Sequence, residues 1–261
     1  MMTTQFDQFS LDFFKLDGQV AIVTGGNSGL GQGYAVALAK AGADVFIVTH
    51  DDNWSETKEL IEKEGKTVVF HQADLTDRNQ AKAAITACQE AFGKIDVLVN
   101  NAGTIRRAPL LEYKEDDWDA VMDINLNAVY FLSQAVARIM KEQGNGKIIN
   151  VASMLAFQGG KFVPPYTASK HGVAGITKAF ANELAEYNIQ INAIAPGYIK
   201  TANTAPIRAD EKRNAEILSR IPANRWADPA DLMGVIVFLA SKASDYMNGH
   251  ILAVDGGWLA R

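Results

Sequence analysis

The chain has 261 residues and a formal net charge of -5. Nucleic acids and anionic membranes bind basic protein surfaces, so this acidic balance argues against both as partners and favours a small-molecule ligand. Cys88 is the only cysteine, which excludes an internal disulfide and fits a reducing compartment. The sequence has no secretory signal pattern and no apolar run near the ~18 residues that a membrane span requires, so a cytoplasmic protein is expected.

The first element is an N-terminal extension, residues 1–16. Phe6, Phe9, Phe13 and Phe14 have the spacing of one apolar stripe on a short helix. We expect this stripe to pack against the body of the protein or against a second subunit.

From residue 20 onward, short apolar runs alternate with longer segments of helical period. This alternation is typical of βαβ units whose parallel sheet is covered by helices on both faces. The apolar runs predict seven strands: Val20 to Val23, Val45 to Val48, Thr67 to Phe70, Val97 to Val99, Lys147 to Val151, Gln190 to Ile194 and Ile251 to Val254. Helices are expected near residues 30–41, 55–64, 78–92, 115–142, 166–187 and 229–241. The predicted fold class is α/β, a doubly wound Rossmann-type three-layer sandwich with a seven-stranded parallel sheet, in one catalytic domain over residues 1–261.

Residues 197–228 break the alternation. Gly197, Pro206 and Pro222 surround a charged, helix-like stretch from Arg208 to Arg220. An insertion of this length between a strand and the next core helix is often an active-site lid. We predict that it forms a substrate loop.

A glycine-rich turn, Thr24 to Gly31, separates the first predicted strand from the first helix. Gly25, Gly29 and Gly31 lack side chains, so the backbone can turn tightly and approach a pyrophosphate at the helix N-terminus. Three residues separate the first two of these glycines, unlike the single residue of the general G-x-G-x-x-G fingerprint. The turn predicts a dinucleotide-binding site.

This variant of the turn resembles that of the short-chain dehydrogenase/reductase family, and further motifs similar to those of the family follow over about residues 16–261. They are Asp74-Leu75, Asn100-Asn101-Ala102-Gly103, Asn125, Ser153, Tyr166-x-x-x-Lys170, Pro196-Gly197 with Thr201, and Val254-Asp255-Gly256-Gly257. The resemblance implies hydride transfer between a nicotinamide cofactor and an alcohol or carbonyl carbon, in a homotetramer.

The resemblance also implies where the cofactor lies. Asp74 and Leu75 approach the adenine, the Asn100 to Gly103 turn lines the cofactor cleft, and Thr201 meets the nicotinamide carboxamide. The expected cofactor-binding residues are Thr24, Gly25, Asn27, Ser28, Gly29, Leu30, Gly31, Thr49, His50, Asp74, Leu75, Asn101, Ala102, Gly103, Tyr166, Lys170, Pro196, Gly197, Ile199 and Thr201.

Tyr166 and Lys170 lie four residues apart, so on a helix they project from one face. An ammonium near a phenol favours the phenolate, and bringing a tyrosine from its ordinary pKa near 10 toward neutrality requires roughly 3 units. We expect Lys170 and the positively charged nicotinamide to supply this shift. Tyr166 then exchanges a proton with the substrate oxygen, which Ser153 holds by a hydrogen bond. The resemblance gives Lys170 a contact with the nicotinamide ribose and Asn125 a water-mediated proton relay, so the expected catalytic residues are Asn125, Ser153, Tyr166 and Lys170.

The end of the second predicted strand bears on the choice of cofactor. An acidic residue there binds the adenosine ribose of NAD, whereas arginines bind the extra phosphate of NADP. This chain has Thr49-His50-Asp51-Asp52 and no basic residue in the glycine turn. NAD is therefore expected, with NADP as the alternative. No metal is expected, because no ligand spacing links the other histidines: His71, His171 and His250.

Polar and basic side chains near the catalytic residues indicate the substrate class. A guanidinium binds carboxylates well, and amide groups suit sugar hydroxyls. We therefore expect an acidic, polar substrate whose carboxylate meets Arg106. The candidates are Arg106, Arg107, Gln158, Lys161, Arg208, Arg213 and Arg225, and the expected substrate-binding residues are Arg106, Ser153, Gln158 and Tyr166.

Five stretches further resemble one subgroup of the family, the bacterial 2-dehydro-3-deoxy-D-gluconate 5-dehydrogenases, also known as 2-deoxy-D-gluconate 3-dehydrogenases. They are residues 100–107, 153–160, 194–199, 208–211 and 254–261. The resemblance implies a keto-sugar acid substrate from the breakdown of pectin or other uronate-containing polysaccharides, and a tail near a partner's active site. The alternatives are a gluconate 5-dehydrogenase, a 3-oxoacyl-thioester reductase, and a nucleotide-sensing regulator without turnover.

Overall fold

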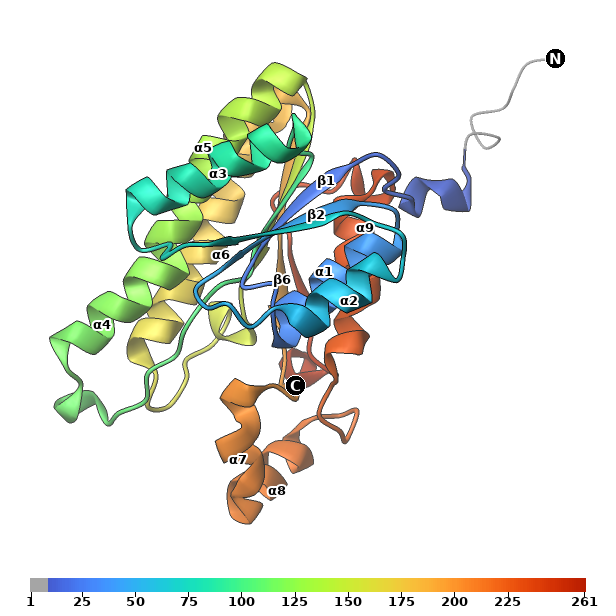
Figure 1. Cartoon of the computed structure of the whole chain (residues 1–261). Helices are drawn as coiled ribbons and strands as arrows, with labels where there is room; N and C mark the ends of the chain where they lie inside the picture. The colour runs from blue at the N-terminus through green and yellow to red at the C-terminus, as the bar shows by residue number, and fades with distance from the viewer. Residues whose placement is uncertain (1–8) are drawn as a thin grey trace.

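The computed structural model describes residues 9–261. A sheet of seven parallel strands lies at its centre, in the order β3-β2-β1-β4-β5-β6-β7 (Figure 1). This confirms the predicted doubly wound α/β class, and every predicted strand lies within a few residues of its expected position. The strands are β1 (Val20–Thr24), β2 (Asp44–Thr49), β3 (Val68–Gln72), β4 (Val97–Asn100), β5 (Gly146–Val151), β6 (Ile189–Pro196) and β7 (Ile251–Val254).

Helices cover both faces of this sheet. Figure 1 shows α1, α2 and α9 on one face and α3, α5 and α6 on the other. In residues 9–261, no helix combines the length and the apolar character needed to cross a membrane. The α-helices are α1 (Gly29–Lys40), α2 (Ser55–Glu62), α3 (Arg78–Phe92), α4 (Glu115–Met122), α5 (Ala128–Gln143), α6 (Pro164–Leu184), α7 (Ala205–Ala209), α8 (Glu211–Arg220) and α9 (Met233–Ala240).

The central strands are buried on both faces, which explains why they read as continuous apolar runs. Alternate residues of β1 point into opposite layers. Ala21 and Val23 belong to an apolar cluster with residues of α1 and α9, whereas Val20 and Ile22 belong to a second cluster with residues of α3 and α5. The two clusters hold the sheet between two helical layers, as expected for a three-layer sandwich.

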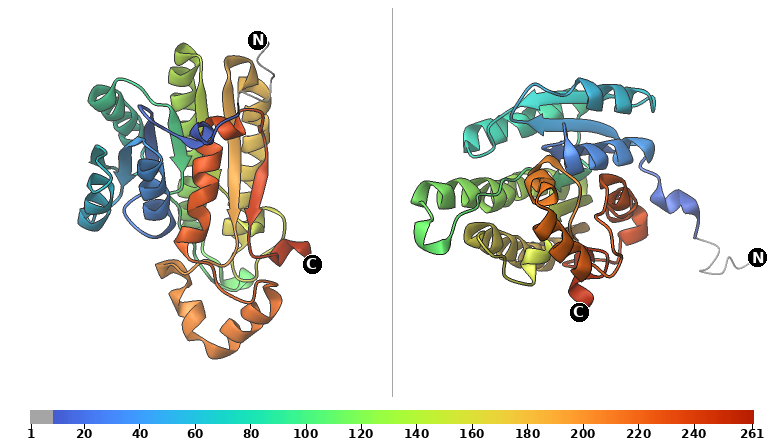
Figure 2. Two further views of the ribbon diagram at one scale, coloured as in Figure 1. Left: turned by 90° about the vertical axis from the view of Figure 1, so that its right-hand side faces the viewer. Right: turned by 90° about the horizontal axis from the view of Figure 1, so that it is seen from below.

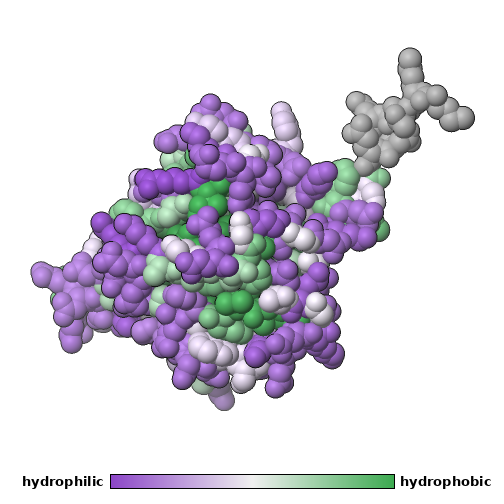
Figure 3. Space-filling view, turned by 45° about the horizontal axis from the view of Figure 1, so that its top comes forward, coloured by the Kyte–Doolittle hydropathy of each residue, from purple (hydrophilic) through white to green (hydrophobic). Residues whose placement is uncertain are grey.

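The described part of the N-terminal extension packs on the body of the protein. Its short 3-10 helix η2 (Leu11–Phe14) places Phe14 with its ring centroid 6.5 Å from that of Phe238 in α9. Lys242 Nζ lies 5.9 Å from the centre of the Phe13 ring. The predicted stripe is thus in contact with the body at this helix, and Phe6 lies outside the described residues. Figure 3 shows hydrophobic surface next to the residues drawn in grey. In the described part of the extension, Phe9 is 66% exposed.

The single helix predicted over residues 115–142 is wrong in one respect, because a π-helical segment, η4 (Asp123–Asn127), separates α4 from α5. The side chain of Asn125 is the reason. Its Oδ1 accepts from Thr104 N at 2.8 Å and its Nδ2 donates to Thr104 O at 2.9 Å. This paired contact ties the helix to the loop after β4, and such bulges are frequent at functional sites.

The loop over residues 197–228 projects from the end of the sheet, and Figure 2 shows α7 and α8 there, away from the helical layers. The charged stretch from Arg208 to Arg220 is not one helix as predicted. It breaks at Asp210, whose carboxylate caps α8 by accepting from Arg213 N at 3.0 Å. An N-cap aspartate satisfies a first-turn amide, so it starts a new helix rather than continuing the old one.

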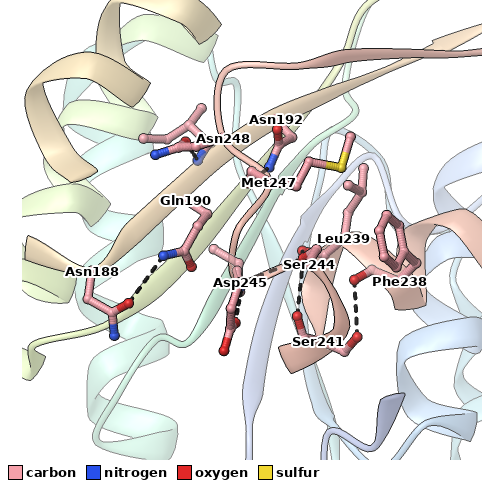
Figure 4. A network of polar contacts seen from close by, with 12 residues as sticks. Asn188, Gln190, Asn192, Phe238, Leu239, Ser241, Ser244, Asp245, Met247 and Asn248 are labelled. Atoms are coloured by element: carbon pink, nitrogen blue, oxygen red, sulfur yellow. Dashed lines mark hydrogen bonds and ion pairs between the residues drawn. The ribbon is translucent and has the colours of Figure 1, made fainter. Parts of the chain in front are cut away.

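A polar network fixes β7 beside β6 (Figure 4). Asn192 in β6 donates from Nδ2 to Met247 O at 2.7 Å, and its Oδ1 accepts from His250 N at 3.0 Å. These bonds hold the segment before β7 in a register that pairs Pro196 with Val254. The substrate loop therefore leaves the sheet from a fixed point at the end of β6.

Candidate active site

The chain order places a crevice at the ends of the strands. It runs from β1 outward to β3 and then returns to the other side of β1 at β4. Ligands of doubly wound sheets bind at the carboxyl ends of the strands at such a reversal. The glycine turn follows β1, the turn that ends at Gly103 follows β4, Ser153 follows β5, and Gly197 follows β6. The predicted site segments thus share one end of the sheet.

The glycine turn fits a close approach of backbone to a phosphate. Gly25 and Gly29 have φ values of 63° and 55°, in the left-handed region that glycine favours. A Cβ at Gly31 would collide with the carbonyl of Gly25 and lie 2.5 Å from Asn101 Nδ2. Ser28 is the N-cap of α1 but makes no side-chain capping hydrogen bond. First-turn N–H groups of α1 therefore keep their capacity to bind an anion.

Hydrogen bonds lock the glycine turn to the turn after β4. Thr24 Oγ1 accepts from Asn101 N and from Ala102 N, both at 2.9 Å. Asn101 Nδ2 donates to Thr24 O at 2.9 Å. Gly103 lies against Asn125, because a Cβ there would be 2.9 Å from Asn125 Oδ1. The two turns therefore form one rigid floor of the crevice.

The predicted adenine-side residues lie after β3. Both the amide and the hydroxyl of Thr76 donate to Asp74 Oδ1, at 2.9 Å and 2.8 Å, and these bonds lower the pKa of Asp74. The charge of His50 lowers it further, which places His50 on the same side of the crevice. Leu75 is buried in the apolar cluster under α3. Leu30, in the first turn of α1, packs partly buried against the other cluster.

Asn27 ties the glycine turn to the end of β2. Its Nδ2 donates to Asp51 Oδ1 at 2.7 Å, and Asn53 N donates to the same oxygen at 3.1 Å. Thr49 is buried, and its Oγ1 donates to Asp51 O at 3.1 Å. The carboxylate of Asp51 is therefore held beside the glycine turn.

The segment after β6 reaches the glycine turn from the other side. Thr201 lies across from Gly29, where a Cβ would be 3.8 Å from Thr201 Cγ2. A capping box with Thr204 and a 3.2 Å hydrogen bond from Arg208 Nη2 to Thr201 O hold this position. Ile199 is buried below it. The structure thus brings the segment from Pro196 to Thr201, as predicted, to the crevice.

Three of the four predicted catalytic side chains converge near the start of α6. The ammonium of Lys170 lies 5.5 Å from the centre of the Tyr166 ring and donates to Val151 O at 2.6 Å. The hydroxyl of Ser153 interacts with the phenol of Tyr166 and accepts from Leu155 N at 3.1 Å. The phenol of Tyr166, a proton donor, therefore has the hydroxyl of Ser153 and the ammonium of Lys170 as neighbours.

Asn125 is connected to this group through an intermediate residue. It is fully buried, and its Nδ2 donates to Ser169 Oγ at 3.3 Å. Ser169 Oγ in turn donates to Tyr166 O at 2.8 Å. Because Thr104 and Ser169 occupy its amide, the Asn125 side chain fixes backbone positions.

Burial controls the pKa values of the two central groups. Desolvation raises the pKa of Tyr166, while Ser153 and then the charge of Arg107 oppose the rise. Desolvation also lowers the pKa of Lys170 to about 8. In the structure without cofactor, loss of hydration outweighs the nearby charges, so the expected shift of the phenol toward neutrality by Lys170 and the nicotinamide together stays a prediction.

A cavity of about 630 Å³ lies between the loop after β4, the loop before α6 and the lid helices. Charged side chains form much of its wall. Phe162, which also lines it, has a left-handed φ of 68°, and strained backbone of this kind is common at ligand-binding sites. The residues that line the cavity are Arg107, Ala108, Pro109, Lys161, Phe162, Ile207, Asp210, Arg213 and Glu216.

Arg107, rather than the predicted Arg106, belongs to this cavity. Arg106 points to α4, where its Nε lies 3.5 Å from Asp117 Oδ1, and half of its side chain is exposed. Within residues 9–261, no carboxylate oxygen lies within 4.0 Å of the Arg107 guanidinium, which reaches Asn203 O at 3.4 Å. Arg107 therefore carries an uncompensated charge at the cavity wall.

The remaining candidates have different surroundings. Gln158 Oε1 accepts from Arg220 Nη2 at 3.5 Å, so it contacts the lid helix. Arg225 forms a double ion pair with Asp231, with both hydrogen bonds at 2.7 Å, and is engaged there. Tyr198 was not predicted, although it packs 4.9 Å from Trp258 beside the lid. Its position directly after Pro196-Gly197 was the available signal. Over residues 9–261, no three His, Cys, Asp or Glu side chains are grouped for a metal ion.

Comparison with known proteins gives close matches over nearly the whole chain. A family model described as enoyl-(acyl carrier protein) reductase matches residues 25–259. The 2-dehydro-3-deoxy-D-gluconate 5-dehydrogenase of Escherichia coli (strain K12) is 56% identical over 252 residues, which cover 96% of this chain and 99% of that protein. The protein of the same name from Bacillus subtilis (strain 168) is 55% identical, with 96% and 98% covered. A solved structure from Agrobacterium tumefaciens, assigned as a 2-deoxy-D-gluconate 3-dehydrogenase with bound NADP, has a TM-score of 0.90 and 52% identity and covers 95% and 99% of the two chains.

Proposed function

This chain belongs to the short-chain dehydrogenase/reductase family, and we propose that it interconverts an alcohol and a ketone on a keto-sugar acid. The proposed substrate is 2-dehydro-3-deoxy-D-gluconate, oxidised at carbon 5, or its ketone product, reduced there, in the breakdown of uronate-containing polysaccharides such as pectin. One observation carries the proposal. The phenol of Tyr166 lies beside Ser153 and Lys170, and the rise of its pKa through burial is opposed by the charge of Arg107, which lines a cavity large enough for a sugar acid.

Tyr166 is the proposed proton donor and acceptor. When bound, the nicotinamide cofactor supplies or accepts a hydride at the reacting carbon. In reduction, Tyr166 gives its phenolic proton to the carbonyl oxygen, and in oxidation it takes that proton back. Ser153 donates a hydrogen bond to the same oxygen and holds it in line. The raised pKa of Tyr166 keeps the phenol protonated before reduction, which suits the reductive direction.

Lys170 and Asn125 support this exchange. With its pKa lowered to about 8, Lys170 exchanges protons readily near neutral pH and can replenish the phenol. We propose that it also binds the nicotinamide ribose. The Asn125 side chain is engaged with Thr104 and Ser169, so the relay that we assign to Asn125 uses its backbone carbonyl.

Arg107 is the proposed anchor for the substrate carboxylate. An ionised acid meets an uncompensated guanidinium at the cavity wall, and Lys161 adds a second positive charge nearby. Gln158 is proposed to contact substrate hydroxyls. Charged walls disfavour the long apolar chain of an acyl thioester, although the family model is named for a reductase of such substrates.

Replacing Arg107 with alanine is expected to raise the KM for the sugar acid by about 10- to 100-fold, the range for losing one charge-assisted hydrogen bond, with kcat changed far less. The matched control is Arg106→Ala at the adjacent position, whose guanidinium already faces Asp117. Steady-state kinetics with saturating cofactor separates the two. A larger effect at Arg106 than at Arg107 contradicts the assignment.

Asp51 is the proposed reason for a preference for NAD over NADP. Its carboxylate, fixed beside the glycine turn by Asn27, repels the extra phosphate of NADP. Asp51→Asn keeps an oxygen acceptor for Asn27 and Asn53 but removes the charge. We expect the Kd of NADPH to fall about fivefold, the effect of ~1 kcal/mol between close charges in water, with the Kd of NADH unchanged. Fluorescence titration without substrate measures both, and an equal change in the two Kd values contradicts the proposal.

The substrate is tested by a panel of acids and thioesters, each assayed with NAD(H) and with NADP(H). The panel holds 2-dehydro-3-deoxy-D-gluconate, gluconate, 5-ketogluconate and an acetoacetyl thioester. The highest kcat/KM is expected for 2-dehydro-3-deoxy-D-gluconate. Faster turnover of gluconate or of the thioester favours one of the alternative enzymes, and cofactor binding without any turnover favours a nucleotide-sensing protein.

We also propose a homotetramer that works in the cytoplasm. Figure 3 shows apolar surface in the middle of an otherwise hydrophilic face. On α5, Tyr130 is 36% exposed. The apolar surface in Figure 3 and the exposed ring of Tyr130 are both areas that sister subunits can bury. Cys88 is a buried free thiol whose pKa burial raises to about 12, so it is unreactive. Light scattering tests the expected subunit number.

A further inference from the structure

We propose that Arg261 is a positioning residue that fixes lid helix α8, and with it Arg213, at the substrate cavity. The guanidinium of Arg261 contacts the end of this helix directly. Its Nη2 donates to Ser219 O at 2.7 Å and its Nε donates to Arg220 O at 3.1 Å. The kinetic consequence of this contact rests on the proposed function, whereas its structural consequence does not.

Ser219 and Arg220 are the last two residues of α8. The carbonyls at a helix C-terminus have no partner within the helix and carry its partial negative charge. A guanidinium that donates to two of them satisfies both acceptors and offsets that charge. Arg261 therefore acts as a side-chain cap supplied from outside the helix.

A second contact joins the same two segments in the opposite sense. The guanidinium of Arg220 lies 4.0 Å from the centre of the Trp258 ring. Trp258 is only 4% exposed, in the 3-10 helix η10 (Trp258–Ala260) that follows β7. Asp255, directly after β7, holds the conformation of this tail by accepting from Gly257 N and Leu259 N, both at 2.9 Å. Arg261 of the tail thus contacts the end of α8, and Arg220 of α8 contacts Trp258 of the tail.

Other attachments of helix α8 are the packing of Ile217 in an apolar cluster with Trp226 and Trp258, and a 2.7 Å hydrogen bond from Trp226 Nε1 to Asn214 Oδ1. Ile217 is the single fully buried residue of the helix, and most of the helix surface is charged. The helix nevertheless carries Arg213 and Glu216 into the cavity wall. Segments with few buried apolar contacts open at low free-energy cost, so a cap at the helix end has a large influence on their position. The tail thus contacts the lid of its own chain, and its expected position near a partner's active site stays a prediction.

The experiment compares Arg261→Ala, Arg261→Lys and the control Lys212→Ala in the full chain. Lys212 is an exposed cation on α8. Its replacement with alanine removes one positive charge, as Arg261→Ala does, but removes no contact to the tail. Hydrogen exchange of residues 211–220 is read first, without substrate or cofactor. Arg261→Ala is expected to speed this exchange about tenfold, as fits the loss of charge-assisted hydrogen bonds, and to leave exchange in β1 and β6 unchanged.

Kinetics then tests the effect on substrate. Arg261→Ala is expected to raise the KM for the sugar acid about fivefold, a fraction of the effect of losing a direct charged contact, with kcat and the Kd of NADH unchanged. Arg261→Lys retains the positive charge but has one ammonium in place of the planar fork that donates to both carbonyls, so it is expected to restore only part of both readouts. Lys212→Ala leaves both as in the parent protein.

The outcomes separate the two proposals. Unchanged exchange in α8 after Arg261→Ala overturns the positioning role, whatever the substrate is. Faster exchange together with an unchanged KM overturns the link from α8 to substrate binding. If no sugar acid is turned over by the parent protein, the proposed function fails, while the exchange data still decide whether Arg261 fixes the lid helix.

Discussion

Replacing Tyr166 with phenylalanine is expected to lower kcat by about 10²- to 10⁴-fold, the usual contribution of a positioned general acid or base. The substitution removes one hydroxyl and keeps the ring, which packs at the start of α6. Ser153 and Lys170 remain, but neither replaces the phenol as direct proton donor: the Ser153 hydroxyl is a far weaker acid, and Lys170 donates to Val151 O at 2.6 Å. Single-turnover oxidation of bound NADH by the keto acid measures the loss.

Two controls keep this result specific. The Kd of NADH, read by fluorescence, is expected to stay within about twofold, because a factor of two is only ~0.4 kcal/mol and the glycine turn is untouched. Tyr246→Phe alters a fully exposed phenol far from the site and is expected to leave kcat unchanged. Full turnover by the Tyr166→Phe enzyme refutes the assignment.

The pH dependence of the reaction follows from the same group. Reduction needs the protonated phenol and oxidation needs the phenolate. Because burial raises the pKa of Tyr166, oxidation is expected to gain rate as pH increases, while reduction keeps its rate across neutral pH. Removing the Ser153 hydroxyl takes away a contact that lowers this pKa, so Ser153→Ala shifts the oxidation profile to still higher pH.

The strands were predictable because a parallel sheet covered on both faces requires apolar runs, and β1, with all five residues buried, begins with such a run from Val20 to Val23. The π-helical segment at Asn125 was not, since it depends on hydrogen bonds to Thr104, 21 residues away in the sequence. The break between α7 and α8 had a local signal, Asp210 at the N-cap, which the charged pattern around it obscured.

The proximity of Tyr166 and Lys170 was predictable from their spacing, because two residues four apart on one helix face require only helical geometry. The choice between Arg106 and Arg107 was not, since neighbouring residues in a loop point in directions that only the fold decides. The same holds for the pKa of Tyr166. Sequence places a cation four residues away, but the burial that outweighs it comes from the packing of distant segments.

Lys170 provides the second large effect, because activity and stability are expected to change in opposite directions. Its side chain is only 5% exposed, and its hydrogen bond goes to a neutral acceptor, Val151 O. Burial lowers its pKa from 10.5 to about 8, which corresponds to roughly 3 kcal/mol of disfavoured charge at 1.36 kcal/mol per unit. Lys170→Met removes that charge and keeps an apolar stem, so kcat is expected to fall about 10²-fold or more, as for loss of a proton-transfer group.

At pH 7 the free energy of unfolding of Lys170→Met is expected to exceed that of the parent by about 1–3 kcal/mol, after allowance for the unpaired Val151 carbonyl. The folded parent releases the Lys170 proton near pH 8 and the unfolded chain near 10.5, so between these values the unfolded chain binds more protons. The parent therefore gains stability as pH rises through this window, and the difference between the two proteins shrinks. Denaturant titrations at pH 7 and pH 10 measure it.

Lys147→Met is the matched control for this stability gain. Lys147 is also buried in the sheet, and burial lowers its pKa, but its ammonium donates to Asp245 at 2.8 Å. Removing it leaves that carboxylate without its partner, so no comparable gain is expected. If Lys170→Met is less stable than the parent at pH 7, or if both lysine variants gain equally, then the ammonium of Lys170 is not held at a cost. In that case the lowered pKa of Lys170, on which its proposed proton exchange near neutral pH depends, is not supported.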